Sequence, residues 1–149
     1  MSNVIVVDAS LALKWIIREP DSGIAKTLLK RWNADRTDII APCLFAYEIT
    51  NILYRQVVTG KLSYGETKLL LKNLFSTGVL LDFSEYENIS MRAMEFAHRF
   101  GLPAAYDAHY LALAERENCE YWTADARLLN AIKGKLPWVR KLEDYQAAN

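Results

Sequence analysis

Four acidic residues stand where a carboxylate could take part in chemistry. Asp8 ends the apolar run VIVV at residues 4–7, and Asp125 follows YWTA at the end of another expected strand. Asp107 stands at the head of an expected helix, and Glu48 borders the apolar face of a different helix. Each acid also has an ordinary alternative role. This is helix capping for the three aspartates and a salt bridge between helices for Glu48.

The junctions that carry three of these acids should lie close together, because strand-to-helix junctions share one edge of a parallel sheet. Unpaired carboxylates that converge repel one another unless a cation neutralises them. Carboxylate oxygens favour Mg²⁺ or Mn²⁺ over zinc, and the two histidines, His98 and His109, form no recognisable ligand pair. The pattern therefore favours hydrolysis of phosphate esters by a water molecule that a metal activates.

Strands and helices alternate along the chain. Strands are expected at residues 4–7, 38–42, 78–83 and 119–123, with a final strand or tail at 138–142. Helices are expected at residues 9–19, 21–35, 43–60, 63–75, 87–101, 107–118 and 124–134. Such alternation predicts an α/β sandwich with a mostly parallel sheet flanked by helices.

Composition sets the frame for these elements. The chain has 149 residues, of which 52% are hydrophobic, so we expect one domain spanning 1–149. Its 18 basic and 18 acidic residues balance, so a polyanionic partner would need a local patch of positive charge. The spacing of Cys43 and Cys119 indicates neither a disulfide framework nor a zinc site, and we expect reduced core thiols. No targeting or membrane-spanning segment is visible, which predicts a cytoplasmic protein.

Four stretches in this order resemble the motifs of the PIN-domain ribonucleases, and within that family the VapC-type toxins of toxin–antitoxin pairs. They are VVDASLALKW, APCLFAYEITNIL, YDAHYLALA and YWTADARLL. The resemblance implies a doubly wound, mostly parallel sheet and a Mg²⁺-dependent endoribonuclease, with Mn²⁺ able to replace Mg²⁺. It also implies a homodimer and a small cognate antitoxin that inserts a segment near the site.

The same resemblance assigns roles to individual residues. The acidic quartet would be Asp8, Glu48, Asp107 and Asp125, with Thr123 as the hydroxyl of the last motif. We expect Asp8 and Asp107 to be the principal metal ligands, and the other two acids to bind directly, through water, or at a second metal. Asp8→Asn should then spare the fold and abolish cleavage.

Several neighbours of these acids could orient ligands or bind RNA. Ser10 and Asn51 could orient water or a carboxylate, and their alternatives are helix capping and a plain helix surface. Arg55 is the first choice of cation because it shares a polar stripe with Glu48 and Asn51. The other candidate cations are Lys14, Arg18 and Arg127.

Three aromatic residues near the motifs are Tyr47, Tyr106 and Trp122. Aromatic side chains can stack on the unpaired bases of single-stranded RNA. Packing in the core is the commoner role of such side chains, and we expect it here.

Other classes of protein also place an acid after the first strand. A phosphorylation-receiver domain would need an acidic pair there, and Asp82 is only a weak candidate for its phosphoacceptor. A haloacid-dehalogenase-type phosphatase would have a second aspartate where Ser10 stands. A catalytically silent PIN-fold module that binds RNA or protein stays open.

Overall fold

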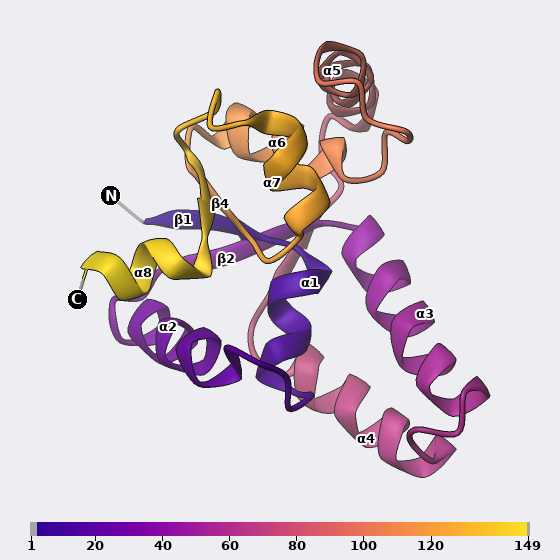
Figure 1. Cartoon of the computed structure of the whole chain (residues 1–149). Coiled ribbons are helices and arrows are strands. Elements are labelled where there is room, and N and C mark those ends of the chain that lie inside the picture. The colour runs from indigo at the N-terminus through magenta and orange to yellow at the C-terminus, as the bar shows by residue number, and fades with distance from the viewer. Residues whose placement is uncertain (1–2, 149) are drawn as a thin grey trace.

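The computed structural model describes residues 3–148 and is built on one five-stranded parallel sheet (Figure 1). Its strands are β1 (Val4–Val7), β2 (Asp38–Pro42), β3 (Leu80–Asp82), β4 (Glu120–Thr123) and β5 (Val139–Lys141). Their order is β3-β2-β1-β4-β5, and every pair of neighbours is parallel. The predicted α/β class and parallel sheet are confirmed.

Helices cover both faces of this sheet, so the expected doubly wound arrangement is also confirmed (Figure 1). They are α1 (Ala9–Ala12), the short 3₁₀ helix η1 (Leu13–Trp15), α2 (Ser22–Ala34), α3 (Leu44–Val58), α4 (Tyr64–Phe75), α5 (Tyr86–Arg99), α6 (Ala108–Glu117), α7 (Ala126–Ile132) and α8 (Leu142–Ala148). Helix α6 packs on β1, β2 and β4. On the other face, Trp32 of α2 meets Trp122 of β4 edge-on, with ring centroids 5.8 Å apart.

The two-sided cover explains why β1 is a continuous apolar run. Ile5, Val6 and Val7 are all buried, because a parallel strand between two helical layers has no solvent face. Helix α6 is likewise buried from Tyr110 to Ala114. The core therefore lies on both sides of β1 and continues past its end around α1 and α3.

Two elements differ from the sequence-based prediction. The helix expected at residues 9–19 ends as η1 at Trp15, because Ser22 bonds the backbone of the following turn. Its hydroxyl accepts from the Glu19 amide over 2.9 Å and donates to the Ile17 carbonyl over 3.1 Å. Helix α8 follows β5 where only a strand or tail was expected, and the Asp144 carboxylate accepts a hydrogen bond from the backbone N–H just before its first turn.

Glycines follow two helices at the ends expected from the sequence, residues 60 and 101. Gly60 follows α3 with φ +74°, and Gly101 follows α5 with φ +62°. Glycine adopts this left-handed conformation without the steric cost that a Cβ brings.

The cysteines and the helix lengths test two further expectations. Cys43 and Cys119 are free thiols, but both are half-buried at the margin of the core instead of inside it. Within residues 3–148, no helix is both long enough and apolar enough to cross a bilayer.

Candidate active site

The pairing of β1 with β4 brings Asp8 beside Thr123. Val7 lies opposite Trp122 in this parallel pair, so the next residues along, Asp8 and Thr123, meet at the carboxyl edge of the sheet. Side chains alternate along a strand, so Tyr121 and Thr123 point to the same face. Both hydroxyls donate to Oδ2 of Asp8, and the Tyr121 hydrogen bond is 2.6 Å long.

Asp8 is buried, with 6% of its surface exposed, and four donors surround its carboxylate. The Ser10 hydroxyl donates to Oδ1 over 2.7 Å, and the Leu11 backbone N–H donates to the same oxygen over 3.1 Å. Burial raises the pKa of Asp8, and the four hydrogen bonds oppose that rise. Asp8 is therefore the N-cap of α1 and also a buried carboxylate at the site, so its two alternative roles coexist.

Glu48 projects half-buried from the polar edge of α3. Its Oε1 accepts a hydrogen bond from the Tyr110 hydroxyl over 2.7 Å. Burial raises the pKa of Glu48 to about 7; the Tyr110 hydrogen bond opposes this rise, and the charges of Asp107, Asp8 and Asp125 add to it. Glu48 has no ion-pair partner among the described residues, so its alternative role as a salt bridge between helices is wrong.

Asp107 and Asp125 stand at the heads of α6 and α7 but are used differently. Asp107 occupies the N-cap position without a side-chain capping hydrogen bond, so its alternative role as a cap is wrong. Its pKa is raised by burial and then by the charges of Asp125 and Asp8. Asp125 does cap its helix, because Oδ1 accepts from the backbone N–H groups of Arg127 and Leu128 over 2.9 and 3.4 Å.

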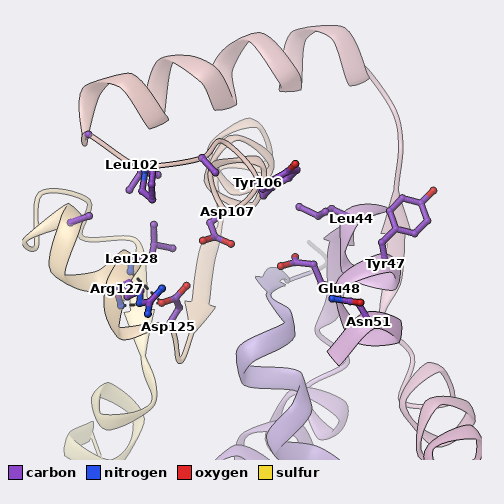
Figure 2. A pocket seen from close by; sticks show the side chains of 14 residues that line it. Leu44, Tyr47, Glu48, Asn51, Leu102, Tyr106, Asp107, Asp125, Arg127 and Leu128 are labelled. Atoms are coloured by element: carbon purple, nitrogen blue, oxygen red, sulfur yellow. Dashed lines mark hydrogen bonds between the residues drawn. The ribbon is translucent and has the colours of Figure 1, made fainter. Parts of the chain in front are cut away.

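Two adjoining cavities bring the four acids together. The first, of about 370 Å³, is lined by Asp8, Ser10, Lys14, Glu48, Asp107 and Asp125 among others. The second, of about 470 Å³, is lined by Leu44, Tyr47, Glu48, Asn51, Leu102, Tyr106, Asp107, Asp125, Arg127 and Leu128 among others. Figure 2 shows Glu48, Asp107 and Asp125 pointing toward a common space from three different elements. Those three acids line both cavities.

The candidate cations are not equally placed. Arg127 lines the larger cavity and Lys14 the smaller one. Arg55, the first choice from the sequence, is exposed one turn beyond Asn51 on α3 and lines neither cavity, and Arg18 lines neither as well. The stripe on α3 leads away from the acids after Asn51, because a helix rises about 5.4 Å per turn.

The three aromatic residues separate into two groups. Trp122 is buried against Trp32, as expected of a core residue, and its ring has no free face for RNA. Tyr47 and Tyr106 are 71% and 66% exposed, so the expectation of core packing is wrong for both. They line the larger cavity (Figure 2).

Comparison with known proteins identifies the family to which this fold belongs. A family model described as the PIN domain matches residues 5–134. This chain belongs to the PIN-domain family. Its relatives include ribonuclease VapC9 of Mycobacterium tuberculosis, which is 32% identical over 134 residues, 90% of this chain and 95% of the relative. Ribonuclease VapC3 of Pyrobaculum aerophilum is 29% identical over 124 residues, 83% of this chain and 91% of the relative.

A solved structure matches the PIN fold along the whole chain. The crystal structure of PAE2754 from Pyrobaculum aerophilum has a TM-score of 0.67 and covers 99% of this chain and 97% of its own. At 24% sequence identity it supports the fold alone. The family match and the VapC relatives identify a VapC-type PIN domain, which excludes the receiver and dehalogenase-type alternatives.

The donor chemistry of this PIN site fits a hard divalent cation. Carboxylates from four elements line it together with the Ser10 hydroxyl, and no thiol or imidazole is among the lining residues. Within residues 3–148, no three acidic, histidine or cysteine side chains already form a cluster that could hold an ion. Repulsion between like charges favours such a spread. Each oxygen of Asp8 already accepts two hydrogen bonds. Asp8 can therefore bind a metal only if one of these hydrogen bonds breaks.

Sequence reasoning missed two residues of the site, Tyr110 and Tyr121. Burial raises the pKa of both phenols, so they remain protonated donors to Glu48 and Asp8. Their spacing carries a signal that could have been read. Tyr110 lies one helical turn after Asp107, and Tyr121 lies two strand positions before Thr123.

The raised pKa of Glu48 predicts that the stability of the metal-free protein depends on pH. The folded state binds a proton at Glu48 more tightly than the unfolded state, whose pKa is near 4.5. The free energy of unfolding should therefore fall as the pH rises from about 4.5 to about 7. Glu48→Gln removes this titration and should reduce the slope. Urea unfolding in EDTA at a series of pH values measures it.

The matched control is Glu87→Gln, at an exposed acid in the first turn of α5, which should keep the wild-type slope. Asp8 and Asp107 also have raised pKa values and should leave a residual slope in Glu48→Gln. An unchanged slope in Glu48→Gln would contradict the raised pKa of Glu48.

Proposed function

We propose that this VapC-type PIN domain is an endoribonuclease that hydrolyses RNA phosphodiester bonds with Mg²⁺, which Mn²⁺ can replace. The convergence of four acids carries this proposal, because none of them has an ion-pair partner in the described part of the chain. Glu48 and Asp107 are half-buried with no compensating charge, which weakens a fold, so stability does not explain these two acids. The names of the relatives, which are ribonucleases, support RNA as the substrate.

The four acids would hold the ion, with Asp8 and Asp107 as the principal ligands and Glu48 and Asp125 completing the site. When bound, a divalent ion lowers the pKa of its water and stabilises the charge that develops on the phosphoryl oxygens. The role of the chain would be to direct its carboxylates toward the position of the ion. Asp8 is fixed most firmly, because four donors restrain it.

Two hydroxyl groups connect Asp8 by hydrogen bonds to the backbone around Asp125. Ser10 Oγ donates to Asp8 and accepts from the Ala124 N–H over 3.0 Å. Thr123 Oγ1 donates to Asp8 and accepts from the Asp125 N–H over 3.0 Å. The end of β1 and the loop before α7 are therefore held by one hydrogen-bond network, which supports a shared role for the two acids.

The larger cavity supports binding of unpaired RNA. Tyr47 and Tyr106 offer exposed aromatic faces beside the acids, and bases stack on such faces whatever their sequence. Arg127 has no ion-pair partner among the described residues and is available to a phosphate. Asn51, also in the lining, can hydrogen-bond to a base or to water.

We further propose that the chain is the toxin of a type II toxin–antitoxin pair, acts in the cytoplasm, and forms a homodimer that a small antitoxin inhibits. The VapC names of its relatives support this role. Both partners need apolar surface, and two surfaces offer it. Helices α3 and α4 expose Tyr54, Val58, Tyr64 and Leu69. The edge strand β3, the turn after it and the start of α5 expose Leu80, Leu81, Phe83 and Tyr86.

A catalytically silent PIN module is the second candidate. Two observations favour it: the described acids do not form a ready metal cluster, and Asp8 already accepts four hydrogen bonds. In this reading the buried carboxylate of Asp8 serves the fold by tying β4 to α1. Metal-dependent cleavage separates the two candidates.

Asp107→Asn is the sharpest single test of catalysis. The Asp107 side chain accepts no hydrogen bond from the described residues, so the variant should fold with unchanged or higher stability. Loss of a metal ligand should lower the Mg²⁺-dependent cleavage rate by more than the roughly 10- to 100-fold typical of outer partners of metal ligands. Cleavage of a labelled RNA panel with Mg²⁺ and with EDTA measures this.

Asp38→Asn is the control for that test, because Asp38 is exposed at the start of β2, at the opposite edge of the sheet. It should cleave like the wild type. A folded Asp107→Asn that cleaves at the wild-type rate, or a wild type without metal-dependent cleavage, would leave the silent module as the better reading.

Removing the two exposed tyrosines should weaken RNA binding without altering the acids. Tyr47→Ala and Tyr106→Ala should each raise KM by roughly 5- to 150-fold, which corresponds to ~1–3 kcal/mol per stacked base, and change kcat little. Steady-state cleavage of a single-stranded RNA measures both constants. Met94→Ala, at an apolar residue of α5 that is 64% exposed and lines neither cavity, should change neither. KM values equal to that of the wild type in all three variants would refute the stacking role of Tyr47 and Tyr106.

The toxin role has its own test in cells. Induced expression of the wild type should arrest growth, and Asp107→Asn should not. Co-expression of a small protein encoded by an overlapping upstream reading frame should restore growth. Growth that continues under wild-type induction, with metal-dependent cleavage present in vitro, would indicate a solitary nuclease.

A further inference from the structure

Two buried tyrosines connect two of the acids through their rings. Tyr110 of α6 and Tyr121 of β4 are fully buried and stack, with centroids 5.7 Å apart and ring planes 12° apart. The Tyr121 hydroxyl donates to Asp8 over 2.6 Å, and the Tyr110 hydroxyl donates to Glu48 over 2.7 Å. The stack therefore runs from the end of β1 to the middle of α3.

The backbone explains how these rings meet. Tyr121 and Thr123 point to one face of the sheet, and α6 packs on β1, β2 and β4. Tyr110 lies one turn after Asp107 on that helix. The helix that carries Asp107 thus also supplies the donor that meets Glu48.

Packing alone does not account for the two hydroxyl groups. Phenylalanine would fill nearly the same volume and keep the offset stacking of the rings. A buried hydroxyl lowers stability unless it finds a partner, and here each hydroxyl bonds a carboxylate of the candidate site. The hydroxyl groups are therefore the informative part of this pair.

We propose that Tyr110 and Tyr121 are positioning residues that act as one support. Their hydroxyls set the directions of Glu48 and Asp8, and the stacked rings fix these two carboxylates relative to each other for a shared divalent ion. This inference rests on the proposed function, because a shared ion is what makes the relative placement of the carboxylates matter.

Tyr110→Phe and Tyr121→Phe test the support without removing the rings. Calorimetric titration of the RNA-free protein with Mn²⁺ should show binding about 10-fold weaker in each variant, at the low end for outer partners of metal ligands. The double variant should lose less than the product of the single losses, because one missing hydroxyl already frees the pair. Circular dichroism and urea unfolding verify that each variant is folded.

Cleavage kinetics test the positioning role of the two tyrosines independently. At a fixed Mn²⁺ concentration below saturation, kcat should fall while the KM for RNA stays unchanged, because neither buried phenol reaches the substrate. Tyr145→Phe, at a half-buried tyrosine of α8 that lines neither cavity, is the matched control and should equal the wild type. If Tyr121→Phe does not fold, Tyr110→Phe decides alone, because its hydroxyl meets a half-buried carboxylate.

The possible results distinguish the positioning role of the two tyrosines from the proposed nuclease function. Folded Phe variants that bind Mn²⁺ like a wild type that cleaves RNA would overturn the support and leave the nuclease standing. A double variant that loses the full product would overturn the joint action of the two rings. A wild type that binds no Mn²⁺ would overturn both the support and the proposed function.

Discussion

The burial of the Asp8 carboxylate at the carboxyl edge of the sheet is the constraint on which the rest of the site depends. A charge that is only 6% exposed is tolerable when donors replace the lost water. The donors come from the first turn of α1 and from β4, far apart in sequence, so the parallel pairing of β1 with β4 must form in its observed register. A shift of one residue would turn Thr123 away from Asp8.

Glu48 and Asp107, unlike Asp8, are not surrounded by hydrogen-bond donors from the described residues. Glu48 and Asp107 are half-buried, burial raises both pKa values, and neighbouring negative charges raise them further. No positive side chain in the described part of the chain pairs with either acid, whereas eight ion pairs form among other described residues. Two half-buried acids left to repel each other and their acidic neighbours lower local stability, which is typical of functional sites. A divalent cation is the simplest ligand that would reverse the repulsion.

The parts of this picture that sequence could predict are those that local pattern determines. The VIVV run, the alternation of strands and helices, and the acids at strand ends follow from periodicity and from the geometry of parallel sheets. Partners set by tertiary contact were harder to predict: the phenols of Tyr110 and Tyr121, and the exposure of Tyr47 and Tyr106. The place of Arg55 outside both cavities was hard to predict for a similar reason. Helical periodicity shows which face of α3 a residue lies on, but not how far along the helix the cavity extends.

The central claim is that the four acids form one divalent-metal site. Anomalous diffraction from crystals soaked in Mn²⁺ tests it most directly, because it locates the ion without reference to activity. We expect an anomalous peak between the carboxylates of Asp8, Glu48, Asp107 and Asp125, with these side chains turned toward it. A peak elsewhere, or no peak at a Mn²⁺ concentration that supports RNA cleavage, would contradict it.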